Sequence, residues 1–231
     1  MTESDRIHAR LKRDIITCVF PPSKSLSEAE LSKRYRSSRT PVREACQRLQ
    51  GEGLMVIIPF RGNFIAPLTV TDFHNLQESQ LILDPAAAAY AAQRATLRQI
   101  EAVEASAHYE YRIGVGESYY EFLQRNVKLH VGIAQASGND FLAGMVSSIH
   151  TRLMRFFYLG LSMDAYGLEL VKEHCEIVDA IKARDSERAR KCAHEHVINT
   201  IRRSAGLFQA ATDRSLGVRR SEPALPSELV L

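Results

Sequence analysis

Two helix-start signals lie close together in this chain, and they restrict its N-terminal fold more than any other feature. Ser27 and Glu30 form a capping box, which predicts a helix from about residue 28 to residue 35. The pair Thr40-Pro41 combines a good N-cap with a residue suited to the first helical position, so the next helix is expected over 41–51. Only a short turn separates these helices, which is typical of a helix-turn-helix.

The segments on either side complete this domain. Apolar residues recur at helical spacing over 5–19, and Pro21-Pro22 ends that helix. Residues 54–58 and 64–66 are short apolar runs on either side of a turn that contains Gly62. This pattern predicts a β-hairpin. Three short helices followed by a hairpin predict a winged helix-turn-helix over residues 1–66.

The rest of the chain is expected to be helical. Residues 67–70 form a linker, and no strand pattern follows it. The fold class is therefore mainly α, with the winged helix-turn-helix joined to an all-α helical bundle over 71–210. Helical periodicity is lost over 211–231, which predicts a disordered tail. Helices are expected at 69–94, 98–112, 117–136, 139–160, 164–184 and 186–208.

Composition and charge narrow the class of protein. The 231 residues contain no long apolar run and no secretory signal, so a cytoplasmic protein that does not enter a membrane is expected. The 4 cysteines form no Cys-x-x-Cys pair, which favours reduced, buried thiols over a zinc ribbon or a redox motif. Residues 1–66 hold 12 Lys and Arg against 7 Asp and Glu, which indicates a polyanionic partner.

Residues 38–45, with the sequence Ser-Arg-Thr-Pro-Val-Arg-Glu-Ala, form the most specific motif in the chain. Glu52-Gly53-Leu54 and Arg61-Gly62 follow it. In order and spacing, these residues resemble the DNA-binding domain of the GntR family of bacterial regulators. The resemblance covers nearly all of residues 5–66, and it implies a regulator that binds double-stranded operator DNA.

The chemistry of this motif fits DNA recognition. A recognition helix places its N-terminal residues against base edges in the major groove, and the fork of an arginine suits guanine O6 and N7. Arg39 and Arg43 are therefore expected to read bases, although ordinary solvated charges are the alternative. Short hydroxyls suit phosphate, and a hairpin tip can approach the minor groove. The predicted DNA-binding residues are Ser38, Arg39, Thr40, Arg43, Arg61 and Gly62.

One position departs from the family pattern in this region. Ala29 stands where many GntR regulators carry an arginine, between Glu28 and Glu30. If that arginine helps to read the operator in other members, this chain has one contact fewer, and its sequence preference is expected to differ.

The helical half resembles the FCD ligand-binding domain of the FadR subfamily over about residues 70–208. Three features carry this resemblance: an alanine-rich stretch after Asp84, the motif Asn126-x-x-x-His130, and the histidines His174 and His196 further along the chain. In that family an Asp or Asn and three histidines bind a divalent metal inside the bundle, and imidazole ligands suit zinc or nickel. The ligands that the resemblance implies are Asn126, His130, His174 and His196.

These four ligands would all be uncharged, because Asn126 replaces the usual aspartate. The ion would keep its full charge, so weaker metal binding and a small carboxylate effector are expected. Arg152 and Arg155 are predicted to clamp this carboxylate, with exposure to solvent as the alternative. Gln80 and Asp84 replace the arginine and glutamate usual in the family, so the effector is expected to differ as well.

Together these features predict an effector-responsive transcriptional repressor that binds a palindromic operator as a homodimer. Two alternatives stay open. Three histidines with open metal positions would also suit a metal-dependent hydrolase, although the chain has no His-Glu-x-x-His motif and no persuasive general base. The other alternative is an architectural DNA-binding protein without a ligand. The winged helix-turn-helix, which an enzyme would not need, favours the regulator over an enzyme.

Overall fold

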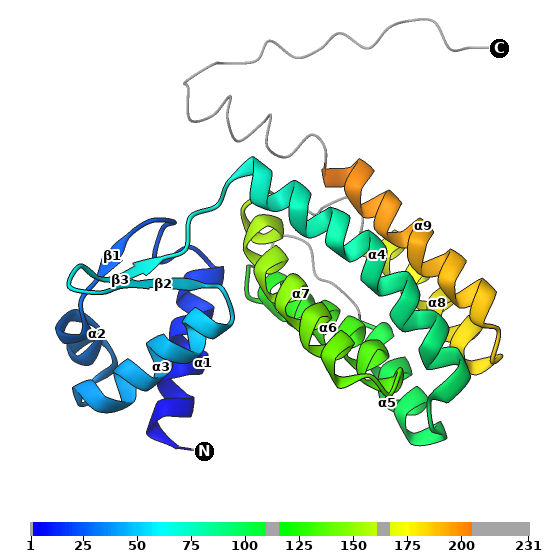
Figure 1. Ribbon diagram of the computed structural model, residues 1–231, viewed down its shortest axis with the longest axis horizontal. Coiled ribbons are helices and arrows are strands. Elements are labelled where there is room, and N and C mark those ends of the chain that lie inside the picture. The colour runs from blue at the N-terminus through cyan, green and yellow to red at the C-terminus, as the bar shows by residue number, and fades with distance from the viewer. Residues whose placement is uncertain (1, 110–115, 161–166, 205–231) are drawn as a thin grey trace, which may run out of the picture.

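The computed structural model describes residues 2–109, 116–160 and 167–204, and it divides into two parts (Figure 1). The N-terminal part, coloured blue to cyan, contains three helices and a small sheet. The C-terminal part, coloured cyan-green to orange, is helical throughout its described residues. The predicted fold class is therefore confirmed. The predicted tail over 211–231 lies outside the described residues.

Three helices form the N-terminal part: α1 (Glu3–Ile16), α2 (Glu28–Tyr35) and α3 (Arg39–Gly51). The predicted cap of α2 is confirmed, since the hydroxyl of Ser27 accepts a hydrogen bond from the amide of Glu30 at 3.1 Å. The apolar faces of the three helices close on one core together with the sheet. This core contains, among others, Ile7, Leu11, Leu31, Val42, Leu49 and Ile65.

Two helix ends differ from the sequence-based expectation. The first helix ends at Ile16 rather than near residue 19, because Cys18 has a positive φ of 55°, which is incompatible with a continued helix. The recognition helix starts at Arg39 with Ser38 as its N-cap, so the prediction of Thr40 as the cap is wrong by two residues. Pro41 remains within the first turn, where its missing N–H removes no helical hydrogen bond.

The sheet has three strands, β1 (Ser25–Leu26), β2 (Met55–Ile58) and β3 (Gly62–Ile65), in the antiparallel order β1-β3-β2. The predicted hairpin is confirmed as β2 and β3, which pair from Met55 with Ile65 to Ile58 with Gly62. The sequence did not predict β1, because a strand of two residues carries no alternation of its own. It pairs with β3 through Ser25 and Leu26, and so ties the start of α2 to the hairpin.

Six helices form the C-terminal part in the described ranges. The first, α4, begins at the predicted cap, where Thr69 accepts a hydrogen bond from the amide of Asp72 at 3.0 Å. The second ends at Ala107, earlier than predicted, because His108 leaves the helical conformation with ψ 90°. Residues 110–112 of the predicted helix lie outside the described residues. The helices are α4 (Val70–Arg94), α5 (Leu97–Ala107), α6 (Gly116–Ala136), α7 (Asp140–Gly160), α8 (Gly167–Lys182) and α9 (Ser186–Ser204).

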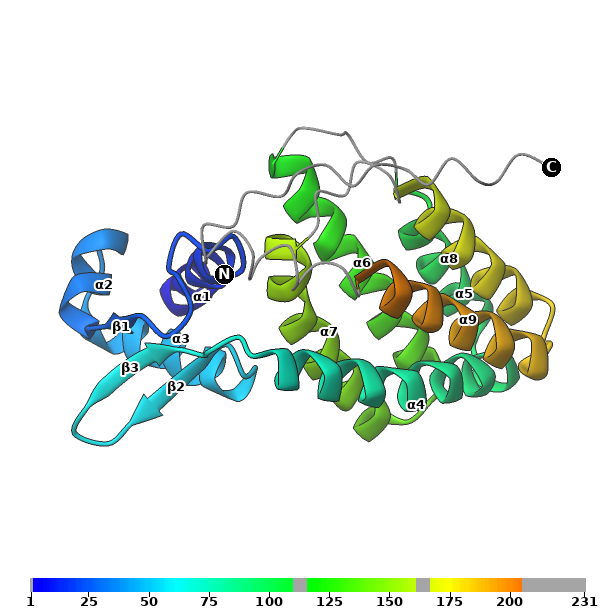
Figure 2. The same cartoon turned by 90° about the horizontal axis from the view of Figure 1, so that it is seen from above.

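The long helix α4 holds this bundle together. It contacts α6, α7, α8 and α9, and α9 runs beside it along most of its length (Figure 2). Its alanines, from Ala87 to Ala92, are largely buried and let the neighbouring helices approach closely. A second cluster, rich in aromatic side chains from α6 and α7, lies toward the N-terminal part. Within the described ranges no helix is both long and apolar enough to cross a membrane.

The two parts meet at the end of α1 and along α7. Ile16 is fully buried and belongs to the aromatic cluster of the bundle. The Arg152 side chain packs against Gly53, where an added β-carbon would lie 2.9 Å from Cδ of the arginine. Arg155 is 1% exposed, and its Nη1 donates to the carbonyl of Ala66 at 2.9 Å. One helix of the bundle therefore contacts both the DNA-binding domain and the segment that leads out of it.

Candidate metal centre and nucleic-acid interface

The predicted DNA-binding residues all lie on the exposed surface of the winged helix-turn-helix. Arg39, Thr40 and Arg43 are exposed on the first turns of α3. Ser38 is exposed too, and its hydroxyl does not cap the described helix, so it can donate to a phosphate oxygen. The helix N-terminus adds backbone amides and the positive end of a dipole, which attract phosphate. The surface therefore has the donors that a DNA contact needs, and the contact itself remains a prediction.

The hairpin tip supplies the remaining two predicted residues. Arg61 and Gly62 are both exposed, and the amide of Arg61 closes the turn on the carbonyl of Ile58 at 3.0 Å. Gly62 has φ +103°, which an L side chain rarely adopts, so the glycine is needed for this turn. Phe60 is fully exposed beside them, with φ 62°. Sequence reasoning did not name it, although an apolar residue at a wing tip can contact the minor groove.

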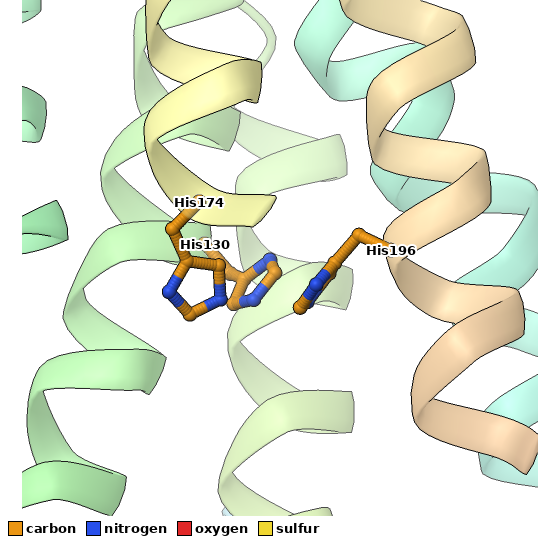
Figure 3. A group of neighbouring side chains, drawn as sticks. All are labelled: His130, His174 and His196. Atoms are coloured by element: carbon orange, nitrogen blue, oxygen red, sulfur yellow. The ribbon is translucent and has the colours of Figure 1, made fainter. Parts of the chain in front are cut away.

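Three of the four predicted metal ligands meet inside the bundle. His130 comes from α6, His174 from α8 and His196 from α9, and Figure 3 shows the three rings turned toward one another. Each of the three is at most 5% exposed. One ring nitrogen from each lies within 4.8 Å of the others. Such a spacing allows all three nitrogens to converge on one ion after small side-chain adjustments.

The nitrogen atoms that face the centre are those a metal would use. Nε2 of His130 and Nε2 of His174 are buried and have no hydrogen-bond partner among the described residues. A buried polar atom without a partner is costly, and a bound cation would satisfy both nitrogens. His196 points its Nδ1 at Glu173, 2.8 Å away, which leaves its Nε2 for the centre. The residues therefore fit a divalent ion.

Two carboxylates, the buried Asp84 and the half-buried Glu173, contact the Nδ1 atoms of His130 and His196 and so orient these rings. Asp84 lies 3.2 Å from Nδ1 of His130 and 2.9 Å from Nε2 of His150. Glu173 accepts from Nδ1 of His196 and, at 2.8 Å for each oxygen, from the guanidinium of Arg203. Carboxylates in these positions fix the tautomer of a ligating histidine and increase its basicity. The resemblance supplied the histidines, whereas the partnership of Asp84 and His150 depends on tertiary contact between α4 and α7.

Burial and these contacts set the protonation states at the centre. Burial lowers the pKa of His130 to about 4 and lowers that of His174 well below its usual value. Both rings are therefore neutral near pH 7, which is the form that binds a metal. Burial opposes ionisation of Glu173, but Arg203 and His196 outweigh it and lower the pKa of the carboxyl to about 2. For Asp84, His150 and His130 likewise outweigh burial, and its pKa lies well below the ordinary value.

A small cavity of about 40 Å³ adjoins the histidines. Asn126, the fourth predicted ligand, lines this cavity together with His130 and His196, and it is half-buried. Gln80 and Thr200 supply the other polar groups of the wall, and Gln80 keeps a buried Oε1 without a hydrogen-bond partner in the described chain. The rest of the wall is apolar, formed by Phe122, Leu123, Phe157 and Leu170.

Arg152 and Arg155 do not lie where sequence analysis expected them. Neither arginine lines the cavities that the described residues form beside the histidines. Both contact the N-terminal part instead, at Gly53 and at Ala66. The expectation assumed that helical neighbours of His150 share its environment. Arg152 and Arg155 are two and five residues further along α7, and the helical turn carries them onto a different surface.

Comparison with known protein families agrees with this geometry. Residues 3–65 match the bacterial regulatory proteins of the gntR family, and residues 75–199 match the FCD domain. The chain is 26% identical over 195 residues to the HTH-type transcriptional repressor RspR of Escherichia coli, covering 84% of this chain and 85% of that protein. It is 23% identical over 226 residues to the galactonate operon transcriptional repressor of the same species, covering 88% and 97%.

Solved structures agree in fold. Escherichia coli McbR/YncC superposes with a TM-score of 0.67 at 18% identity, covering 91% of this chain and 99% of that one. A transcriptional regulator from Rhodococcus sp. RHA1 superposes with a TM-score of 0.65 at 20% identity, covering 95% and 100%. The family consists of transcriptional regulators rather than enzymes, which removes the hydrolase alternative. The chain therefore belongs to the gntR family of bacterial regulators, and within it to the FadR subfamily, whose members carry a C-terminal FCD domain.

Proposed function

We propose that this regulator is a metal-dependent repressor that binds a palindromic operator as a homodimer and responds to a small carboxylate. The observation that carries the proposal is the presence, in one chain, of an exposed recognition helix and a buried histidine triad with two unpartnered Nε2 atoms. RspR and the galactonate operon regulator are both named repressors, which supports repression over activation.

The metal would be held by His130, His174 and His196, with Asn126 at the edge of the same cavity. Three neutral imidazoles suit zinc or nickel better than magnesium or calcium. A bound ion would supply a positive charge that can accept a carboxylate oxygen. Glu173 and Asp84 would keep the imidazoles in the orientation and tautomer that coordination needs.

The cavity beside the triad favours a short carboxylate with an apolar body. Arginine and lysine are absent from the described cavity wall, so the ion would be the partner of the carboxylate. Gln80 and Thr200 can hydrogen-bond one further polar group, such as a hydroxyl. Phe122, Phe157 and Leu170 would exclude a second charged group, because burying an unpaired charge among them is costly.

A homodimer is supported by exposed apolar side chains on neighbouring helices. Ile82 and Tyr90 lie on α4, whereas Phe141 and Met145 lie on α7, and all four are exposed. The two helices contact each other, so these side chains can belong to one apolar face. A two-fold pair of recognition helices would then match a palindromic site.

The proposal is tested by metal analysis of the purified protein beside three variants. Wild type should hold about one zinc or nickel ion per chain, and His130→Ala and His174→Ala should lose it. His194→Ala is the matched control, because His194 is exposed on the same helix as His196, two residues away. DNA binding is then measured with and without a panel of short hydroxy acids. Absence of metal from wild type after reconstitution would contradict the metal site, and unchanged DNA affinity with every acid would contradict the effector.

A further inference from the structure

Glu28 holds Arg43 by two parallel hydrogen bonds across the helix-turn-helix. Nε of Arg43 donates to Oε1 of the carboxylate at 2.8 Å, and Nη2 donates to Oε2 at 2.9 Å. Glu28 is the first residue of α2, and Arg43 lies in the second turn of α3, so the ion pair joins the two helices. The Arg43 side chain is 61% exposed, against 25% for Glu28, so the guanidinium remains accessible from outside.

The pairing determines which edge of the guanidinium can contact DNA. A guanidinium carries five N–H groups in a rigid plane, and Glu28 occupies the side formed by Nε and Nη2. The end formed by Nη1 and the second N–H of Nη2 is left, and it presents two parallel donors. This end matches the O6 and N7 acceptors of guanine. A held side chain also loses less conformational entropy when it binds.

The pairing also changes how Arg43 contributes to affinity. A free arginine attracts phosphates of any sequence and releases counterions from the DNA. In the pair, the carboxylate cancels that charge and would repel a phosphate placed beside it. The hydrogen bond from Arg43 lowers the pKa of Glu28, and the positive charge of Arg39 contributes to the shift, so the carboxylate stays ionised at neutral pH. The pair is therefore suited to base recognition rather than to general phosphate binding.

The start of α2 makes this pair more important. Ala29, next to Glu28, is exposed and offers no hydrogen-bonding side chain. Glu30 follows it and is exposed as well. Of the two arginines of α3 that are expected to read bases, Arg39 and Arg43, Arg43 is the one that Glu28 holds by two hydrogen bonds.

We propose that Glu28 is a specificity-determining residue that positions Arg43 for end-on recognition of one guanine in each operator half-site. This inference rests on the proposed operator-binding function. Glu28 acts through Arg43 and does not itself contact the base. Loss of its charge should therefore relax the preference at one base pair and strengthen binding to DNA of any sequence.

The experiment starts with a random-sequence duplex library, from which full-length wild type, Glu28→Gln and Arg43→Ala each select their preferred sites. Binding is then measured on the wild-type consensus, on its single-base variants and on a scrambled duplex over a range of salt concentrations. Glu3→Gln is the matched control, because it removes the same charge from an exposed pair with Arg6 on α1. Circular dichroism verifies that each variant is folded.

Glu28→Gln should lose about tenfold discrimination at one guanine per half-site, and Arg43→Ala should lose preference at the same guanine. Binding of Glu28→Gln to the scrambled duplex should be stronger, with a salt slope steeper by about 0.9, which corresponds to one additional phosphate contact. Unchanged base preference in Glu28→Gln, or relaxation at a different position from Arg43→Ala, would overturn the inference. Failure of wild type itself to select any sequence would instead overturn the operator-binding function.

Discussion

Glu173 shows how much of a metal site can depend on a residue that would not touch the metal. One carboxylate accepts hydrogen bonds from His196, Asn199 and Arg203, and its low pKa keeps it charged. If it were neutral, His196 could adopt the other tautomer or turn its ring away from the centre. The position of the His196 imidazole therefore depends on the charge of Glu173, which would not itself bind the metal.

The variant Glu173→Gln should consequently bind zinc or nickel about 10- to 100-fold more weakly, although all three histidines remain. Competition with a chelating dye measures the affinity. The control is Glu169→Gln on the same helix, where the carboxylate is 65% exposed and 3.8 Å from Arg203. Equal affinity in wild type and Glu173→Gln would show that the carboxylate does not orient His196.

The histidines also predict how stability depends on pH in the metal-free protein. The pKa of His130 is about 4 when folded and about 6.5 when unfolded, so the unfolded chain binds more protons between these values. Stability should therefore be complete above pH 6.5 and should fall as the pH decreases toward 4. The loss from His130 alone is on the order of 3 kcal/mol. Urea unfolding at pH 7 and pH 5 should detect about 2 kcal/mol of this loss, and His130→Asn should show a shallower dependence.

At the scale of helices and strands, most elements could be predicted from local chemistry. The caps at Ser27 and Thr69 gave correct helix starts because a side-chain oxygen and an amide three residues later are set by local sequence alone. β1 could not be predicted, since its two residues become a strand only by pairing with β3. The start of α3 was misplaced because Ser38 and Thr40 are both acceptable caps, and only the structure distinguishes them.

The candidate site likewise has a part that the sequence predicts and a part that depends on tertiary contacts. Its three histidines could be predicted because the family motif has recognisable spacing on three helices. The contact of His150 with Asp84 joins residues 66 positions apart on α4 and α7, and no local pattern encodes it. The contacts of Arg152 and Arg155 with the other domain could not be predicted for the same reason, because the sequence does not show which face of α7 meets that domain.

The cap of α4 gives a prediction at this scale. Thr69→Ala removes the oxygen that accepts from the amide of Asp72, and it should lower the free energy of unfolding by about 1 kcal/mol. Ser79→Ala on the same helix is the control, because the Ser79 hydroxyl caps no helix end and donates to the carbonyl of Asn75 within the helix. Chemical denaturation compares the two variants, and equal stabilities would argue against a role for the cap.

At the scale of the whole molecule, the junction between the two domains contains a buried cation. Nη1 of Arg155 donates a hydrogen bond to the carbonyl of Ala66, but its Nε and Nη2 have no hydrogen-bond partner in the described residues. Burial also lowers the pKa of its guanidinium to about 10. Such a group weakens the arrangement in which it is buried, so the contact between the domains should be only marginally favourable. A marginal contact is what a switch needs, because a ligand can change it with a modest difference in affinity.

The variant Arg155→Met keeps an unbranched apolar stem and removes the charge. We expect its free energy of unfolding to lie within about 1 kcal/mol of wild type or above it, because apolar replacements of buried charges are often neutral or stabilising. Thermal and urea denaturation measure this. DNA binding should meanwhile respond less to metal and carboxylate. A loss of several kcal/mol would show instead that the guanidinium stabilises the junction.

Helix α7 carries both ends of this arrangement. His150 contacts Asp84 beside the histidine triad. Arg155, five residues further along the same helix, contacts the segment that leaves the DNA-binding domain. Because both residues lie on one helix, the angle between the two contacts around the helix axis is fixed. A single residue inserted between them would rotate one contact about 100° relative to the other, whereas many substitutions would leave the phase intact. Over evolutionary time, the length of this stretch should be far less free to change than its composition.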